Sequence, residues 1–317
     1  MSTHPEQDND KRPIGGPFKN SAELLTQPEQ LRQRAEEDGY LFIKGMLPAD
    51  AVNSVRQDVL AVLDRHGLLD PAHAAETAMG NIERIRQYTA EEIAWNGVGT
   101  VIDVYRDVQK LESFHALAQS SAILNMLSTL FGETAFPHPR NIARIMLPHP
   151  DVHVTPSHQD YLHVQGSADT WTCWIPLGDV SADLGGLAVL RGSHREGLLG
   201  VARSPGAGGL ESILCGLGYE WETAAYESGD VLAFHSYTVH KSLPNRIPGK
   251  IRLSCDFRYQ KISDPIEQAS LLPHGPFAWD QLYEGWSRTD LPYYWNNRQF
   301  SYKDFDETVR WQKEKIC

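Results

Sequence analysis

Short apolar segments separated by Gly and Pro turns run from Ile142 through most of the remaining sequence. Examples are "WTCWIPLGDV", "GGLAVLRGSH" and "GDVLAF", which are each bounded by turn residues and short enough to be strands. Strands joined by turns at such intervals are typical of a sandwich or barrel, whereas βαβ units would need a helical segment between successive strands. The later part of the chain therefore predicts a mainly β core.

The earlier part of the chain shows helical periodicity instead. Residues 23–37 have a helical pattern that a glycine ends, and "YLFIKGML" (40–47) then predicts a short strand. Residues 47–67 place four valines and a leucine on one helical face and end in a glycine suited to a C-terminal cap. Residues 111–131 form another amphipathic stretch. We expect these helices to flank the β core.

The two ends differ in composition from the rest. The first 20 residues, "MSTHPEQDNDKRPIGGPFKN", are polar and rich in Pro and Gly, and predict a disordered arm. Residues 21–317 predict a single domain, because no linker divides them. Within this domain, residues 276–317 are too dense in Trp, Tyr and Phe to be a free tail, so we expect them to pack over the barrel or to make a subunit contact.

Composition limits the partners of the chain. The formal charge of −12 and the absence of a Lys/Arg cluster argue against nucleic-acid binding. No apolar run approaches the roughly 18 residues that cross a bilayer, and the start lacks the apolar region of a secretion signal. The four cysteines are scattered without a CxxC pair, unlike a disulfide framework or a thiolate zinc site. We therefore expect a cytoplasmic protein with no membrane contact, and nothing in the sequence indicates its oligomeric state.

The segment "PSHQDYLHVQG" (156–166) contains the first candidate metal ligands, His158 and Asp160. If this region is a strand, residues two apart point to the same face, and both side chains could bind one ion. The pair alone is weak, because a chain with 13 His and 41 acidic residues is expected to contain such a pair by chance.

A second segment, residues 226–260, strengthens the case and predicts a strand, a turn and a strand, as in a hairpin. His235 and His240 are five residues apart and should face opposite sides, and we choose His240 as the inward one. Residues of matching parity are then expected to converge near it: Ser242, Arg252 and Ser254. Two His and one carboxylate leave half of an octahedron open, as in non-heme Fe(II) oxygenases, and an Arg can hold the carboxylate of a keto acid bidentately.

These residues resemble the phytanoyl-CoA dioxygenase-like branch of the Fe(II)/2-oxoglutarate-dependent oxygenases, over residues 39–259. The resemblance rests on "HQD", "GGLAVLRGSH", "GDVLAF", "HKS" and "RLS" in this order. It implies a double-stranded β-helix (jelly roll) with flanking helices, with Fe(II) on His158, Asp160 and His240. It also implies 2-oxoglutarate on Ser242 and Arg252, and O2 as the other co-substrate. By strand parity, Ser254 is a weaker candidate and Arg258 is a rival to Arg252. Because related halogenases lack the carboxylate that Asp160 provides, the resemblance favours hydroxylation or another C–H oxidation.

Several neighbouring residues are candidates for substrate contact. Tyr161 and Gln165 could form the cavity mouth or lie in a surface loop. His163 has the wrong spacing to share a strand face with His158, so we expect it near the substrate rather than as a third His ligand of a zinc-like site. Arg144 could meet an anionic group or form a salt bridge. Trp171 and Trp174 have opposite parity, so only one should line the cavity, and we choose Trp174. The Gly-rich residues 204–211 could form a loop that closes over the substrate.

The expected activity is hydroxylation of a small-molecule metabolite or natural-product intermediate, with succinate and CO2 as co-products. Two alternatives stay open. A cupin-type metal dioxygenase would use no keto acid and would have no need of Arg252, and it would usually show three His. A barrel that binds a small molecule without turnover would be distinguished by its failure to bind metal.

Overall fold

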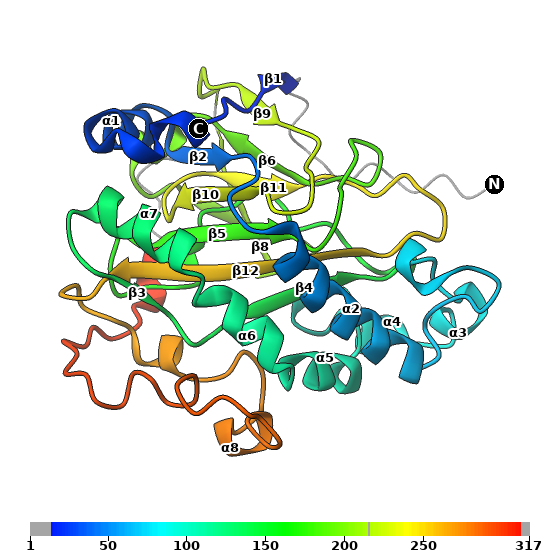
Figure 1. The fold of residues 1–317 in the computed structure, drawn as a ribbon. Helices are drawn as coiled ribbons and strands as arrows, with labels where there is room; N and C mark the ends of the chain where they lie inside the picture. Colours follow the sequence, from blue (N-terminus) through cyan, green and yellow to red (C-terminus); the bar gives the residue numbers. More distant parts are fainter. Residues whose placement is uncertain (1–13, 215, 312–317) are drawn as a thin grey trace.

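Two facing β-sheets form the core of the computed structural model, which describes residues 14–214 and 216–311 (Figure 1). The larger sheet has the order β2-β10-β5-β12-β3, and β4 also pairs with β12. Its strands are β2 (Tyr40–Ile43), β3 (Ala135–Pro137), β4 (Ile142–Met146), β5 (Trp171–Pro176), β10 (Val231–His235) and β12 (Arg252–Lys261). The smaller sheet, β1-β9-β6-β11, contains β1 (Ile14–Pro17), β6 (Leu187–Leu190), β9 (Trp221–Thr223) and β11 (His240–Ser242). The predicted mainly β core with flanking helices is confirmed.

Helices cover the outer face of the larger sheet. In Figure 1, α2, α5, α6 and α7 cross in front of it. The helices are α1 (Pro28–Asp38), α2 (Ala49–Arg65), α3 (Ile82–Ile85), α4 (Ala90–Ile93), α5 (Ile102–Gln109), α6 (Glu112–Ala118), α7 (Ser121–Phe131) and α8 (Trp279–Leu282). The valine-rich face of α2 is buried as expected. The predicted helix over 111–131 is two helices, because the chain leaves the helical path between α6 and α7.

The predicted hairpin over residues 226–260 is wrong. β10 and β12 both pair with β5 in the larger sheet, and β11 between them pairs with β6 in the smaller sheet. The chain thus moves from one sheet to the other and back, as a jelly roll requires. The period-2 pattern identified the strands correctly, but it carries no information about which strand each one pairs with.

β12 has two buried faces with opposite chemistry. Leu253, Cys255, Phe257 and Tyr259 join the large hydrophobic cluster beneath the helices. The alternate residues are polar and buried, and Arg252, Asp256 and Arg258 among them line a cavity between the two sheets. A single strand therefore connects the hydrophobic core to the interior of the barrel.

Both ends of the described chain pack on the fold. The expected disordered arm is wrong for Ile14 to Asn20: β1 pairs in parallel with β9, and Phe18 is buried against the rings of Tyr40 and Phe42 on β2. The polar composition of residues 1–20 gave no indication that Phe18 would pack on the fold. Residues 1–13 lie outside the described residues. At the other end, residues 276–311 supply Trp279 and Trp295 to a separate aromatic cluster on Phe136, and the last six residues of the predicted segment are not described.

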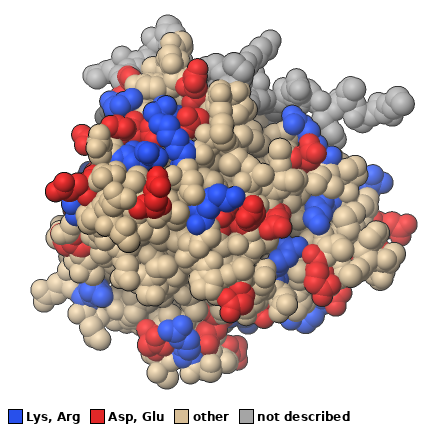
Figure 2. Space-filling model, turned by 45° about the horizontal axis from the view of Figure 1, so that its top comes forward, with Lys and Arg blue, Asp and Glu red and all other residues tan. Residues whose placement is uncertain are grey.

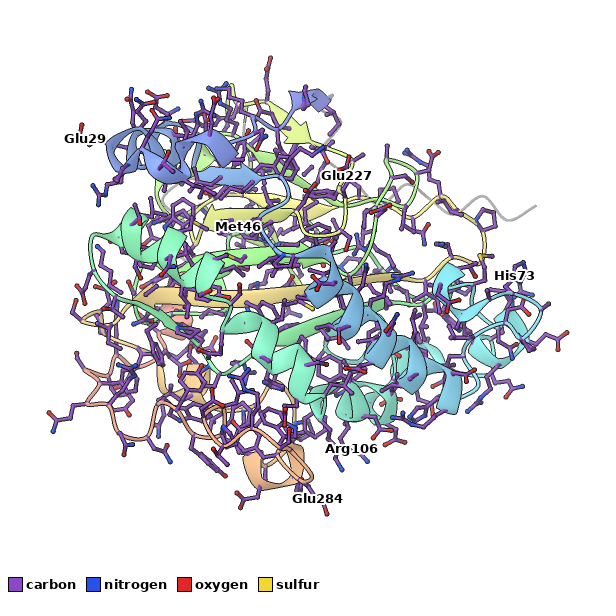
Figure 3. The ribbon with its side chains drawn as sticks, in the orientation of Figure 1. Glu29, Met46, His73, Arg106, Glu227 and Glu284 are labelled. Atoms are coloured by element: carbon purple, nitrogen blue, oxygen red, sulfur yellow. The ribbon has the colours of Figure 1, made fainter. Side chains whose placement is uncertain are left out.

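Charged side chains lie mainly on the outside. Glu29 and Glu284 point away from the sheets in Figure 3, and both are exposed. On the face seen in Figure 2, basic and acidic side chains are interspersed. Among the described helices, none is long and apolar enough to cross a membrane.

We predict that Phe257→Ala lowers the free energy of unfolding by about 3–5 kcal/mol, the usual cost of removing a buried phenyl ring. Phe257 is fully buried on β12 and its ring lies 5.5 Å from that of Phe114 on α6. Urea denaturation followed by circular dichroism measures the change. Leu272→Ala, at a side chain that is 52% exposed, is the control and should stay within about 0.5 kcal/mol of wild type. Equal losses in the two variants would contradict the assignment of Phe257 to the core.

Candidate metal and co-substrate site

Three side chains converge in the cavity between the sheets. The potential ligand atoms of His158, Asp160 and His240 all lie within 4.8 Å of one another, and all three residues are buried. The Nε2 atoms of His158 and His240 lie 3.5 Å and 3.8 Å from Oδ1 of Asp160. Two imidazoles and one carboxylate on one side of a metal position are the donor set of non-heme iron oxygenases.

The backbone brings the two histidines into register. The N–H of each donates to the carbonyl of the other at 3.0 Å, which adds His158 to the edge of β11. Side chains of such a directly opposed antiparallel pair project to the same face. Asp160, in contrast, begins a 3₁₀ turn, Asp160–Leu162. The expectation that His158 and Asp160 share a regular strand was wrong, because the chain turns after Gln159, and this turn directs the carboxylate into the cavity.

Both imidazoles are oriented through their other ring nitrogen. Nδ1 of His158 is 2.8 Å from the carbonyl of Pro156, and Nδ1 of His240 is 3.0 Å from that of Thr238. A ring that donates its Nδ1–H to a carbonyl presents an unprotonated Nε2, the form that binds metal. Burial lowers the pKa of His240 to about 3, so this ring is neutral at physiological pH. The residues present therefore fit an iron ion.

The carboxylate of Asp160 uses its two oxygens differently. Oδ1 faces the imidazoles, whereas Oδ2 accepts a 2.5 Å hydrogen bond from the hydroxyl of Thr172. Nη2 of Arg258 lies 3.4 Å from the same Oδ2. Burial would raise the pKa of Asp160, but Arg258 and the neighbouring His158 hold it well below its usual value. The carboxylate is thus ionised and held with one oxygen directed at the metal position.

The candidate 2-oxoglutarate residues Arg252 and Ser242 both line the same cavity. Nη1 of Arg252 donates to the carbonyl of Gly185 at 2.7 Å, while its buried Nε has no hydrogen-bond partner among the described residues. Burial and the nearby Arg144 lower the pKa of Arg252 to about 10, so it remains charged. The hydroxyl of Ser254 is also buried without a partner in the described chain, but Ser254 is not among the residues that line the cavity.

The predicted substrate residues separate into two groups. Trp174 and Arg144 line the cavity. Trp171, as the opposite parity required, packs in the core beneath the helices. Arg144 also forms a salt bridge of 2.8 Å with Asp256, which raises its pKa against the lowering effect of burial. The salt-bridge reading of Arg144 is confirmed, and its contact with an anionic group of substrate or co-substrate stays a prediction.

The other three predicted residues, Tyr161, His163 and Gln165, do not line the cavity. Gln165 exchanges two hydrogen bonds with the backbone of Asp306, and the hydroxyl of Tyr161 accepts one from Lys303. These two side chains fasten the C-terminal segment to the turn after Asp160, which a pattern within residues 156–166 could not indicate. The ring of His163 lies 5.8 Å from that of His158 but outside the converging ligand set.

The cavity also contains residues that the sequence did not single out. They share strand faces with predicted ones: Thr172 lies two residues from Trp174 on β5, and Asp256 lies four from Arg252 on β12. The same alternation would have found both. Thr155, Leu187 and Phe234 complete the lining, and no chemical signal in the sequence distinguished them from other core residues.

The Gly-rich residues 204–209 form the tip of a hairpin between β7 (Val201–Arg203) and β8 (Leu210–Ser212). This tip lies beside the segment that carries His158. A Cβ atom added to Gly206 would be 2.5 Å from the carbonyl oxygen of Val154, and one added to Gly208 would be 2.6 Å from the ring of His163. Both glycines also have positive φ angles, so the close approach depends on glycine at each.

Comparison with known proteins agrees with this site. The family model for phytanoyl-CoA dioxygenase (PhyH) matches residues 35–253, which include all three converging side chains. The chain belongs to the phytanoyl-CoA dioxygenase family. It is therefore an Fe(II)- and 2-oxoglutarate-dependent oxygenase, and the cofactors predicted from the resemblance are confirmed.

Two curated relatives are 1-deoxypentalenic acid 11-beta-hydroxylases. The protein from Streptomyces arenae is 29% identical over 254 residues, covering 76% of this chain and 83% of its own. The one from Streptomyces exfoliatus is 28% identical over 250 residues, with the same coverage. Among solved structures, the non-heme α-ketoglutarate-dependent epimerase SnoN from nogalamycin biosynthesis aligns with a TM-score of 0.52 at 19% identity, covering 76% of this chain and 85% of its own. This likeness supports the jelly-roll fold of the phytanoyl-CoA dioxygenase family.

We predict that Thr172→Val lowers Fe(II) affinity by about 10-fold or more, because partners that orient a metal ligand typically contribute 10–100-fold to affinity. Asp160→Ala should abolish tight binding. Anaerobic competition with a chromophoric Fe(II) chelator measures both. Thr26→Val, at an exposed threonine, is the matched control and should bind as wild type does. Wild-type affinity in Thr172→Val would show that the hydroxyl does not orient the carboxylate.

Proposed function

We propose that His158, Asp160 and His240 bind Fe(II) and that Arg252 and Ser242 bind the distal carboxylate of 2-oxoglutarate. The observation that carries this proposal is the convergence of two Nε2 atoms and one Oδ1 atom in a buried cavity that also contains Arg252. Three protein ligands leave positions for the keto and neighbouring carboxylate oxygens of 2-oxoglutarate and for O2. Bound iron, 2-oxoglutarate and O2 together supply the oxidant for C–H hydroxylation, with succinate and CO2 as co-products.

The residues of the chain contribute binding, orientation and exclusion of water. The carbonyls of Pro156 and Thr238 fix the imidazoles, and Thr172 fixes the carboxylate of Asp160. The carbonyl of Gly185 holds one end of the Arg252 guanidinium, which leaves its Nε available to an anion. Because the ligands are buried, interactions with a charged co-substrate are stronger than they would be in water. Ser254 is left out of this set, since its hydroxyl does not reach the cavity lining.

The proposed substrate is a natural-product intermediate of modest size. The curated relatives carry the name of a hydroxylase of 1-deoxypentalenic acid, and SnoN acts in nogalamycin biosynthesis. The cavity walls combine Trp174, Leu187 and Phe234 with polar groups, which suits an apolar skeleton with a few polar substituents. The cytoplasmic location and the lack of nucleic-acid contacts remain predictions from composition.

An anaerobic titration tests the proposal. Fe(II) and then 2-oxoglutarate are added to metal-free protein, and the weak visible charge-transfer band of the chelate is followed. We predict that Arg252→Gln needs at least about 10-fold more 2-oxoglutarate than wild type, since a hydrogen-bonded charged partner contributes about 1.5–3 kcal/mol. Its Fe(II) affinity should not change.

Arg258→Gln is the matched control, because it removes another buried guanidinium from the same strand. It should form the band at wild-type concentrations of 2-oxoglutarate. If Arg258→Gln weakened 2-oxoglutarate binding and Arg252→Gln did not, then Arg258 rather than Arg252 would bind the co-substrate. Iron binding without any band would favour the alternative of a metal dioxygenase that uses no keto acid.

A further inference from the structure

Arg258 is a buried cation that contacts Asp160 but is neither a proposed iron ligand nor a proposed 2-oxoglutarate anchor. We infer that Arg258 anchors a carboxylate group of the substrate, so that the enzyme oxidises a monocarboxylic acid. This inference rests on the proposed function, because it assigns the remaining positions of the cavity to metal and co-substrate. It concerns the chemical class of the substrate, which the metal site alone does not determine.

The guanidinium of Arg258 lines the cavity, and two of its three nitrogens lack a hydrogen-bond partner within the described chain. Its residue is only 6% exposed, and it lines the same cavity as the three converging ligands. Nε and Nη1 are buried and have no hydrogen-bond partner within the described chain. A buried guanidinium normally has its N–H groups paired, because leaving a charged donor unpaired costs more than leaving a neutral one. Two donors at this position therefore indicate an acceptor that binds there.

Asp160 does not fully satisfy this cation. Oδ2 of Asp160 has a closer partner in Thr172, at 2.5 Å, and Nη2 of Arg258 lies farther away, at 3.4 Å. Once Fe(II) binds Oδ1, much of the negative charge of Asp160 is directed to the metal. Arg258 then keeps its positive charge inside the cavity.

Counting charges gives the same result. Three cations, Arg144, Arg252 and Arg258, and two carboxylates line the cavity. Asp256 balances Arg144 through their 2.8 Å salt bridge. The distal carboxylate of 2-oxoglutarate would balance Arg252. Fe(II) would be balanced by Asp160 and the metal-bound carboxylate of the co-substrate, so one positive charge remains, on Arg258.

The environment of Arg258 favours a single negative charge. Burial lowers the pKa of the nearby His138 to about 4, so this imidazole is neutral and adds no charge beside Arg258. A phosphate monoester would bring close to two negative charges and leave one unbalanced. The formal charge of −12 also opposes a large polyanion such as an acyl-CoA. A carboxylate fits the one remaining charge and the geometry of a guanidinium.

The test compares acids with their methyl esters. The anaerobic Fe(II)–2-oxoglutarate complex is titrated with abietic, cholic and decanoic acids and with the methyl ester of each, and the shift of the visible band on substrate binding is followed. For at least one pair, the wild type should bind the acid about 10-fold or more tightly than the ester. If no acid in the panel binds more tightly than its ester, the inference is wrong. The band itself would still support the proposed metal and co-substrate site.

Variants then assign the preference to Arg258. In Arg258→Gln the acid and the ester should bind within about 2-fold of each other, and Arg258→Lys should restore part of the preference because it keeps the charge. Thr172→Val is the matched control, since Thr172 also contacts Oδ2 of Asp160 but carries no charge. This variant should bind Fe(II) more weakly but should still bind the acid more tightly than the ester. If Arg258→Gln weakened iron binding as Thr172→Val does but still bound the acid more tightly than the ester, Arg258 would only position Asp160. The inference would then be wrong.

Discussion

The reciprocal backbone hydrogen bonds between His158 and His240 are the constraint on which the rest of the site depends. These bonds place two histidines from distant parts of the chain directly opposite each other, so their side chains enter the cavity from one edge. The turn that begins at Asp160 then adds a carboxylate to the same cavity. Because the main chain fixes the register of the two histidines, the fold itself holds the three potential ligands together.

A second constraint is the cost of keeping charge inside the barrel. Arg144, Arg252 and Arg258 are desolvated, and burial of an isolated cation would be strongly unfavourable. The outer face of β12 offsets this cost, because Phe257 and its apolar neighbours belong to the large hydrophobic cluster beneath the helices. Inside, Asp256 forms a salt bridge with Arg144, and the carbonyl of Gly185 accepts a hydrogen bond from Arg252. Hydrophobic burial on one face of β12 thus offsets the cost of burying charged groups on its other face.

The sequence allowed the strands, the flanking helices and the identity of the converging side chains to be predicted, because each depends on local periodicity or on motif order. Arg252 was placed correctly in the cavity by parity along one strand. The predictions of a regular strand at Asp160 and of a hairpin over residues 226–260 were wrong, because a turn and a change of sheet depend on contacts that are remote in sequence. Gln165 illustrates the same limit. Its hydrogen-bond partner, Asp306, lies in the C-terminal segment, and a period-2 pattern cannot predict where that segment packs.

The charges of the site also imply an order of events. Asp160 is ionised beside Arg258, and the two charges partly balance each other. If Asp160 binds Fe(II) and Arg252 binds 2-oxoglutarate, as proposed, Arg258 is left as the cation without a balancing charge. An acidic substrate would therefore be attracted most strongly after both cofactors are in place, since its affinity includes the electrostatic consequence of their binding. If Arg258 binds the substrate carboxylate as inferred, this one guanidinium would couple occupancy of the metal site to recognition of the substrate.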